Sequence, residues 1–346
     1  MRTSVKSVIF AENILLVKFL VIRFSSIGDI VLTTPVIRAL KQQVEEAEVH
    51  FLVKPAFRQV VENNPYIDKI HVLNERLGDT VSELYNEYFD YIIDLQKNLR
   101  SNRIKRRLGL VSFTFPKLNY AKWLLVNFGI NKLPDLHIVD RYFEAVKIFD
   151  VTNDGRGLDF FLPAETEESA ANAVRSTENP FVVFVVGAKH FTKQIPLEKA
   201  VEICRLCPFP VILVGGPADA EQAEEIARQS GEHVLNMAGK CSLHGSAYLI
   251  SKCAVVVTPD TGMMHIAAAF QKNIVSLWGN TIPAFGMFPY VDKSRRVEME
   301  VTGLKCRPCT KIGFSKCPKG HFRCMNDISI IDIMNTITKF TENKVY

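Results

Sequence analysis

The chain of 346 residues has no long uninterrupted hydrophobic run. A helix that crosses a bilayer needs roughly 18 apolar residues in succession. The nearest candidate, residues 8–24, also lacks the small-residue cleavage site that ends a signal peptide, and polar residues interrupt it: Glu12, Asn13, Lys18 and Arg23. We therefore predict a cytoplasmic protein, and we assign no role to residues 1–16, which precede the first predicted strand.

Charge of one sign is not in large excess either. The net charge is +5, from 42 Lys and Arg against 37 Asp and Glu, which does not by itself indicate nucleic-acid binding. A basic excess on one face would instead suit an anionic substrate or an acidic membrane surface. Low-complexity tracts and short-period repeats are absent as well. The length suits two globular domains of roughly 150 residues each.

Short apolar runs alternate with helix-like stretches, which favours parallel sheets built from right-handed βαβ units. We predict strands at Phe19–Arg23, Val49–Val53, Lys69–Leu73, Tyr91–Leu95, Leu108–Val111, Phe181–Val186, Pro210–Val214, His233–Asn236, Ala254–Thr258 and Asn273–Trp278. The helices that we predict include Pro35–Val44, Val139–Phe149, Leu197–Leu206, Ala218–Gln229 and Leu243–Ser251.

The alternation is interrupted once, between Val151 and Pro180, where turn residues and a closing Asn-Pro are typical of a domain connection. We therefore predict doubly wound domains at residues 1–165 and 166–326. Residues 327–346 are predicted to form a helix that either domain could receive. Its apolar face consists of Ile330, Ile333, Met334, Ile337 and Phe340.

An acid stands at the first strand-to-helix turn, in FLVIRFSSIGDIVLTTPVIRALK, residues 19–41. Asp29 follows Gly28 there. A carboxylate is stabilised at a helix N-terminus, so Asp29 could be only a cap. It is also placed for chemistry, because open α/β sheets bind ligands beyond the carboxyl ends of their strands.

The second half carries a strand-to-helix turn in AVVVTPDTGMMHIAAAF, residues 254–270. Free N–H groups at such a helix end bind phosphate. Gly262 lets the backbone approach a ligand, and His265 could add a donor. An ordinary turn capped by Thr261 is the alternative.

Glycine-bearing loops follow two more predicted strands. Gly187 and Lys193 lie in VVFVVGAKHFTKQIP, and Gly215-Gly216 in VILVGGPADAE. A lysine in such a loop is a point charge suited to phosphate, although a lone lysine is more often a solvated surface residue. Trp278 could form a flat wall for a nucleobase or could pack in the core.

These motifs resemble glycosyltransferase family 9, the ADP-heptose:lipopolysaccharide heptosyltransferases. The matching segments span roughly residues 18–335 and occur in this order: RFSSIGDIVLTTPVIRALK, FDYIIDLQKNLRS, KQIP, LVGGPAD, NMAGKCSL and TPDTGMMHIAAAF. The resemblance implies an α/β GT-B fold, in which two Rossmann-like domains face a central cleft. It assigns the acceptor to residues 1–165 and the nucleotide sugar to residues 166–326.

The resemblance further implies an inverting transfer of heptose, or a related sugar, from an ADP-activated donor to the lipopolysaccharide inner core. Asp29 occupies the position of the catalytic base, in a Ser-x-Gly-Asp loop that includes Ser26 and Gly28 on the acceptor side. The donor-binding residues that it implies are Gly187, Ala188, Lys193, Asp260, Thr261, Gly262 and His265. Gly187 and Ala188 stand where heptosyltransferases often carry hydroxyl residues, so their contacts would come from the backbone.

The sequence has no Asp-x-Asp pair at a strand end, and we predict that catalysis requires no cofactor. Lys193 and the amides after Asp260 would stabilise the leaving diphosphate. Near the place of the family's ribose-binding acid stands Ala218, with Asp219 one step away. Cys241 falls at an adenine-side position.

Basic residues are frequent after the fourth predicted strand, at Lys97, Arg100, Arg103, Lys105, Arg106, Arg107, Lys117, Lys122, Lys132, His137 and Arg141. The lipopolysaccharide inner core bears carboxylates and phosphates, which Arg binds bidentately. A charge run is more often a solvated face, but its place on the acceptor domain favours a function. We predict acceptor contacts from Arg100, Arg103, His137 and Arg141, and a salt-sensitive peripheral association with the cytoplasmic face of the inner membrane.

Four of the eight cysteines lie close together in the sequence, at Cys306, Cys309, Cys317 and Cys324, with His321 between the last two. Disulfides are rare in cytoplasmic proteins, and four thiolates could hold a structural zinc ion. The spacing is short and irregular for a zinc ribbon, so unliganded cysteines are the alternative. The other four cysteines suggest small buried side chains.

Other functions fit parts of the sequence. A GT-B glycosyltransferase could use another nucleotide sugar, and a carbohydrate-binding relative could be inactive. Nucleotide-sugar epimerases share the architecture but lack this Ser-x-Gly-Asp loop. A zinc-containing nucleic-acid-binding protein would use the cysteines and the basic loops. We predict a monomer with no nucleic-acid partner.

Overall fold

The computed structural model describes residues 16–342, so the extension predicted at residues 1–16 lies almost wholly outside the described residues. The first domain holds a parallel sheet of order β3-β2-β1-β4-β5. Its strands are β1 (Val17–Ile22), β2 (Ala47–Val53), β3 (Lys69–Val72), β4 (Tyr91–Asp94) and β5 (Val111–Thr114).

The second domain holds a parallel sheet of order β11-β10-β9-β6-β7-β8. Its strands are β6 (Val182–Val185), β7 (Val211–Val214), β8 (Val234–Asn236), β9 (Val255–Pro259), β10 (Asn273–Trp278) and β11 (Arg296–Glu300). The two parallel α/β domains that the sequence predicts are therefore confirmed.

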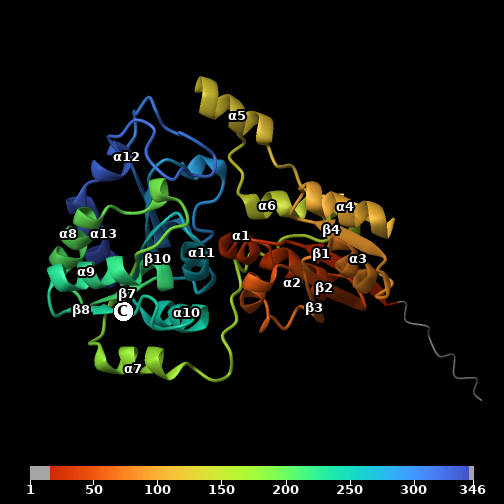
Figure 1. Cartoon of the computed structure of the whole chain (residues 1–346), viewed down its shortest axis with the longest axis horizontal. Coiled ribbons are helices and arrows are strands. Elements are labelled where there is room, and N and C mark those ends of the chain that lie inside the picture. The colour runs from red at the N-terminus through yellow and green to blue at the C-terminus, as the bar shows by residue number, and fades with distance from the viewer. Residues whose placement is uncertain (1–15, 343–346) are drawn as a thin grey trace, which may run out of the picture.

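Helices cover both sheets, as Figure 1 shows. The first domain has α1 (Ile27–Val31), α2 (Thr34–Gln43), α3 (Leu77–Tyr85), α4 (Leu99–Leu108), α5 (Asn119–Phe128) and α6 (Ile138–Phe143). The rest of the described chain adds α7 (Glu168–Ser176), α8 (Leu197–Leu206), α9 (Ala220–Ser230), α10 (Leu243–Lys252), α11 (Gly262–Ala269), α12 (Arg323–Asn326) and α13 (Ile330–Glu342). Because helices cover both faces, the strands are apolar almost throughout: Phe19 to Ile22 have no exposed surface.

Two predicted elements have wrong bounds, and one strand is missing from the prediction. Leu108 ends α4 instead of starting a strand: its side chain is buried, and Gly109 ends the helix with a φ of +69°. The predicted helix Val139–Phe149 is α6 followed by a short 3-10 turn, Lys147–Phe149. The half-buried edge strand β11 reads Arg-Val-Glu-Met-Glu, which resembles an exposed loop in sequence.

The last helix belongs to the second domain. α13 packs against α8, β9 and β10, and Ile333, Ile337 and Phe340 enter the same core as those elements. The predicted apolar face is thus the buried face. No helix between residues 16 and 342 is long and apolar enough to span a bilayer.

The strand order places a topological switch point in each sheet. In the first sheet β1 lies between β2 and β4, and in the second β6 lies between β7 and β9. Ligands of open α/β sheets bind at such points, beyond the carboxyl ends of the strands. Asp29 follows β1, Gly187 follows β6, and Asp260 follows β9.

Candidate active site

The loops after β1 and β9 meet at the junction of the two domains, where α1 packs against α11 (Figure 1). A β-carbon on Gly28 would stand 2.5 Å from Cδ2 of His265 and 3.2 Å from the α-carbon of Gly262. One on Gly262 would stand 2.7 Å from Cβ of Ile27. Only glycine fits at both positions, so the Asp29 loop and the Asp260-Thr261-Gly262 loop come together, as the sequence predicts.

The Asp29 carboxylate is held from both sides. Its Oδ2 accepts the backbone N–H of Ser26 at 3.1 Å and the Ser26 hydroxyl at 2.9 Å, which is the arrangement of a helix cap. Its Oδ1 lies 2.6 Å from Nη2 of Arg23, and a quarter of the side chain stays exposed. Burial alone would raise the pKa of Asp29, but the Arg23 charge and the Ser26 donors outweigh it and hold this pKa below its ordinary value. Asp29 is therefore a carboxylate at neutral pH.

Arg23 is a site residue that the sequence analysis missed. It is 7% exposed, and it also donates to the carbonyl oxygens of Leu95 at 2.5 Å and Ser25 at 3.0 Å. These bonds join the loops that follow β1 and β4 and fix the guanidinium beside Asp29. The one signal in the sequence was a charged residue directly after a buried strand.

On the opposite side of the junction, Lys193 forms an ion pair with Asp260. Lys193 ends a 3-10 turn (Phe191–Lys193), and its Nζ lies 2.5 Å from Oδ2 of Asp260, which also accepts the Thr281 hydroxyl at 2.9 Å. The two residues that the resemblance assigns to the donor thus contact each other directly.

The first turn of α11 is not capped by a side chain. Thr261 occupies the N-cap position, but its hydroxyl makes no capping hydrogen bond and lies 3.3 Å from the Thr258 hydroxyl. The alternative of an ordinary turn capped by Thr261 is therefore wrong. No side chain thus competes for the backbone N–H groups of this turn, and the helix dipole favours an anion there.

His265 lies beneath Gly28 and is 2% exposed. Burial lowers its pKa to about 4, although Asp260 and Asp29 act in the opposite direction. Among the described residues its Nδ1 has no hydrogen-bond partner. The ring is consequently neutral at physiological pH and can donate from one nitrogen only.

Asp219 covers the glycine loop after β6. A β-carbon on Gly187 would stand 2.1 Å from Oδ2 of Asp219, and this oxygen accepts the N–H of Gly216 at 2.8 Å. The neighbouring carbonyl of Ala188 accepts Nε2 of Gln194 at 2.9 Å. Of the two positions that the sequence analysis names in this region, Ala218 and Asp219, the second therefore places a carboxylate against the glycine loop.

The predicted acceptor residues fall into different environments. Arg100 and Arg103 are exposed on α4. His137 is 4% exposed and uses both ring nitrogens inside the protein: Nε2 lies 2.9 Å from the Phe288 carbonyl, and Nδ1 accepts the Val139 N–H at 3.2 Å. Burial lowers the pKa of His137 to about 3. These contacts leave His137 no nitrogen for an acceptor, so they make it a link between the domains.

Arg141 is buried, but only some of its hydrogen-bond donors have a partner. Its Nη2 donates to the Phe285 carbonyl at 3.0 Å, whereas Nε and Nη1 have no partner in the part of the chain that the structure describes. A buried guanidinium without partners is costly, so these two groups are well suited to an anionic ligand.

Lys117 and Lys122 lie near Asp29, and Arg141 and Lys311 lie near Lys122; we call these four residues the basic cluster. Burial and the neighbouring charges of Arg141 and Lys311 lower the pKa of Lys122 to about 8. Burial and the Arg23 charge also lower the pKa of Lys117. Lys122 lies 5.7 Å from the centre of the Phe285 ring, and Lys311 donates to Asn119 at 3.4 Å. Both domains thus contribute positive charge to the basic cluster.

The cysteine segment lies over the loop after β10, where the Cys309 N–H donates to the Asn280 carbonyl at 3.1 Å. Cys306 Sγ is 3.8 Å from Nε2 of His321, and burial together with the neighbouring thiols raises the pKa of Cys309 and of Cys324 to about 11. No three of these ligand atoms lie within 4.8 Å of one another in the described chain. The segment is gathered, but it does not have the spacing of a tetrahedral zinc site.

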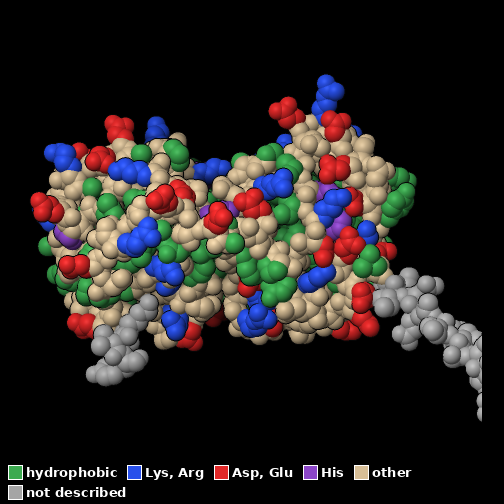
Figure 2. Space-filling model, turned by 90° about the horizontal axis from the view of Figure 1, so that it is seen from below, with side chains coloured by type: hydrophobic (Ala, Val, Ile, Leu, Met, Phe, Trp, Pro, Cys, Tyr) green, Lys and Arg blue, Asp and Glu red, His purple; other side chains and the backbone are tan. Residues whose placement is uncertain are grey.

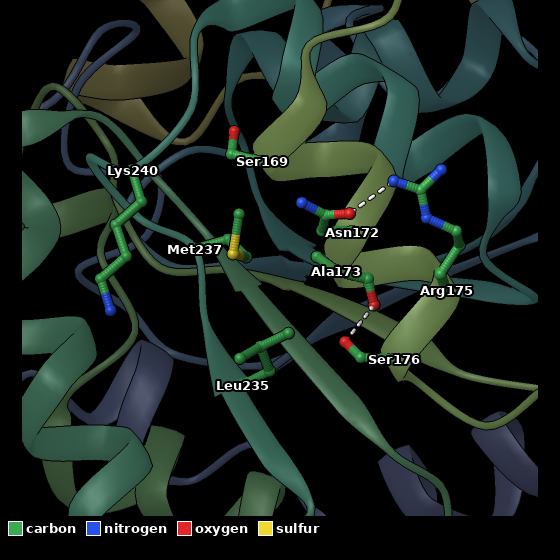
Figure 3. A pocket seen from close by; sticks show the side chains of 8 residues that line it. All are labelled: Ser169, Asn172, Ala173, Arg175, Ser176, Leu235, Met237 and Lys240. Carbon is green, nitrogen blue, oxygen red and sulfur yellow. Dashed lines mark hydrogen bonds between the residues drawn. The ribbon is translucent and has the colours of Figure 1, made fainter.

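A cavity of about 640 Å³ lies elsewhere, between α7 and β8. Its lining includes Leu235, Met237 and Lys240, and on α7 the side chains of Arg175 and Asn172 are hydrogen-bonded to each other (Figure 3). None of the predicted site residues lines it. On the face seen in Figure 2, basic and acidic side chains are interspersed, so that face has no large patch of one sign.

A family model described as glycosyltransferase family 9 (heptosyltransferase) matches residues 79–315. Lipooligosaccharide heptosyltransferase 2 of Haemophilus ducreyi is 28% identical over 78% of this chain and 85% of its own length.

Two solved structures share the fold. The glycosyl transferase family 9 protein of Veillonella parvula superposes with a TM-score of 0.74 at 20% identity, over 94% of this chain and 97% of that one. The E. coli ADP-heptose lps heptosyltransferase II superposes with a TM-score of 0.71 at 19% identity, over 95% and 100%. The predicted GT-B fold is thereby confirmed.

Proposed function

Because this chain belongs to glycosyltransferase family 9, the heptosyltransferase family, we propose that it transfers heptose, or a related sugar, from an ADP-activated donor to the lipopolysaccharide inner core with inversion at the anomeric carbon. The observation that carries the proposal is the packing of the Asp29 loop against the first turn of α11, which directly follows Asp260, the ion-pair partner of Lys193. Its relatives support the substrates: one acts on lipooligosaccharide, and another is an ADP-heptose enzyme.

In this proposal Asp29 is the general base. The acceptor hydroxyl approaches the exposed quarter of the carboxylate and gives up its proton as its oxygen attacks the anomeric carbon. The bond between that carbon and the diphosphate oxygen breaks, and ADP leaves. A positioned base contributes typically about 10²–10⁴-fold to the rate. Arg23 and Ser26 orient the carboxylate and keep it ionised before the acceptor arrives.

The donor diphosphate is proposed to bind between Lys193 and the first turn of α11. Its charge competes with Asp260 for the Lys193 ammonium, while the uncapped amides after Thr261 stabilise the negative charge that develops on the leaving group. Asp219, beside Gly187, is the candidate ligand for the ribose hydroxyls.

The acceptor is proposed to be an anionic glycolipid that meets the basic cluster. The unpaired Nε and Nη1 of Arg141 would bind a carboxylate or phosphate of the inner core, and Lys117 and Lys122 add charge beside it. Arg100 and Arg103 remain predicted contacts farther out on α4. A monomer that associates peripherally with the cytoplasmic face of the inner membrane completes this proposal.

A structural zinc ion on the cysteine segment stays a prediction. In the described chain no three ligand atoms of this segment lie within 4.8 Å of one another, so a bound ion would have to draw the side chains together. Metal analysis of protein purified without chelator tests it.

The experiment incubates the protein with candidate nucleotide sugars and extracted core glycolipid, and reads transfer by mass spectrometry. We expect Asp29→Asn to transfer at least about 100-fold more slowly and still to be stabilised by ADP. Lys193→Ala should weaken donor binding as well as slow transfer. Equal transfer by wild type and Asp29→Asn would remove Asp29 from the mechanism. Stabilisation by an oligonucleotide in place of ADP would favour the nucleic-acid-binding alternative.

A further inference from the structure

The first domain contains a buried histidine pair that the proposed mechanism does not use. His50 lies on β2 and His71 on the neighbouring edge strand β3, and the two side chains are at most 1% exposed. Nδ1 of His50 is 2.9 Å from Nε2 of His71, and the Phe89 ring packs edge-on against both rings. Packing therefore fixes the two rings with these nitrogens facing each other.

The outer nitrogen of each ring faces a carboxylate. Nε2 of His50 is 2.6 Å from Glu48, and Nδ1 of His71 is 2.9 Å from Glu83. An ionised carboxylate only accepts hydrogen bonds, so the ring nitrogen that faces it must carry the proton. If both rings are neutral, their only protons occupy these outer positions, and two bare lone pairs face each other at the centre. A cation must therefore sit between the inner nitrogens: either one extra proton or a metal ion.

A third ligand favours the metal. Oε2 of Glu87 lies 3.9 Å from Nδ1 of His50, and Glu87, His50 and His71 form the one group in residues 16–342 whose three ligand atoms all lie within 4.8 Å. Histidines that bind metals almost always donate their other N–H to a carboxylate, a backbone carbonyl or a water molecule. Both rings already do so here, which a pair sharing a proton does not require.

The distances and charges also suit a metal ion. With Zn–N bonds of about 2.0–2.1 Å, two tetrahedral nitrogen ligands stand about 3.3 Å apart, so the rings need to separate by only about 0.4 Å from their 2.9 Å contact. The three carboxylates Glu48, Glu83 and Glu87 outnumber the two lysines paired with them, Lys18 with Glu48 and Lys69 with Glu87, so the surroundings of the pair are negative and favour a cation. Glu87 is 16% exposed and gives the ion a route from solvent.

We propose that His50, His71 and Glu87 bind a divalent transition-metal ion, with zinc as the first candidate. Imidazole suits zinc, and a water molecule would complete a tetrahedral set. The ion would fasten the edge strand β3 to β2 and to the segment after α3. This site is independent of the proposed glycosyl transfer.

The test uses full-length protein without a polyhistidine tag, in which Cys306, Cys309, Cys317 and Cys324 are replaced by Ser so that thiolates cannot bind the ion. Calorimetric titration with Zn²⁺ should show one equivalent bound, and Co²⁺ should give a visible d–d spectrum without thiolate charge-transfer bands. Glu83→Gln should weaken binding about 10–100-fold, and His71→Gln should abolish it. The matched control Glu75→Gln removes an exposed carboxylate between β3 and α3 and should leave the affinity for Zn²⁺ unchanged.

Three outcomes would overturn the proposal. Folded protein that binds no Zn²⁺ would show that a proton occupies the pair. Binding that disappears when the four cysteines are replaced would assign the metal to the cysteine segment. Equal affinities of wild type, Glu83→Gln and Glu87→Gln would place the ion elsewhere. The two glutamate variants alter partly exposed side chains, so the test stands even if His71→Gln does not fold.

Discussion

Replacing Arg23 by Gln should raise the pKa of Asp29 and move the acid limb of the rate profile to higher pH. The guanidinium lies 2.6 Å from Oδ1 of Asp29, and burial alone would push this pKa upward. An adjacent Arg lowers the pKa of an Asp by about 1–3 units, so its loss should raise the pKa of Asp29 by a similar amount. Each unit corresponds to about 1.4 kcal/mol, which destabilises the ionised carboxylate by about 1.4–4 kcal/mol.

The direction of the pH dependence follows from the linkage between proton binding and folding. Because the folded-state pKa of Asp29 is depressed, the pair stabilises the fold above the unfolded pKa of about 3.9, and this contribution is lost as the pH falls through the folded value. In wild type the carboxylate is thus ionised at every pH at which the enzyme is expected to work. In Arg23→Gln, a protonated and inactive fraction should accumulate at mildly acidic pH.

The assay measures kcat against pH for wild type, Arg23→Gln and Arg23→Lys, with saturating donor and acceptor. Arg23→Lys keeps the charge, so its acid limb should shift less than that of Arg23→Gln. ADP should raise the Tm of all three proteins equally, which checks that the donor site is intact. An Arg23→Gln protein that folds, transfers sugar and retains the wild-type acid limb would refute the assignment of Asp29 as the base.

Three further predictions concern the domain junction. Gly28→Ala should lower the free energy of unfolding by about 1–3 kcal/mol in urea titrations, because its β-carbon would stand 2.5 Å from the buried His265 ring. Lys122, whose pKa is about 8, is charged below that pH and neutral above it; the KM for acceptor should therefore rise above about pH 8, and Lys122→Arg should abolish this rise. The pKa values of His137 and His265, about 3 and about 4, lie below the unfolded value of about 6.5. As the pH falls from about 6.5 to 4, these histidines become protonated in the unfolded state only. The free energy of unfolding should therefore fall by up to about 1.4 kcal/mol per pH unit for each histidine, and His137→Gln should make this fall less steep.

Most of the fold could be predicted because each strand of a parallel sheet that is covered on both faces is a short apolar segment, which can be recognised in the sequence itself. Strand β6 is a continuous apolar run, and β9 has Thr258 as its one polar residue; turn residues bound both strands. The errors arise where an apolar residue fits a helix as well as a strand. Leu108 is apolar because it faces the core from the last turn of α4, and nothing in its neighbours distinguishes this from the start of a strand.

The loops of the site could also be predicted, since Asp29, Gly187 and Asp260 directly follow strands. Their partners could not. Arg23 reaches Leu95 across 72 positions of sequence, and Lys193 meets Asp260 only because β6 and β9 are neighbours in the sheet. Pairings of this kind depend on strand order, which a single sequence does not state.

Two basic residues at α6 show even more clearly that side-chain contacts depend on the tertiary structure. His137 and Arg141 lie one helical turn apart on the same short element, and both contact the Phe285–Phe288 segment of the other domain. His137 is fully satisfied there, whereas Arg141 keeps two unpaired nitrogens. How the domains pack decides this difference, and no local pattern separates the two side chains.

Asp29 finally shows that a cap and a catalytic base need not be alternatives. The Ser26 contacts that start α1 are hydrogen bonds to the charged form of the carboxylate, so they lower its pKa together with Arg23. A lower pKa makes Asp29 a weaker base but keeps it unprotonated inside a crowded junction, where burial acts in the opposite direction. Since a base must be ionised before it can accept a proton, the local stability of the turn and its proposed chemistry depend on the same three contacts.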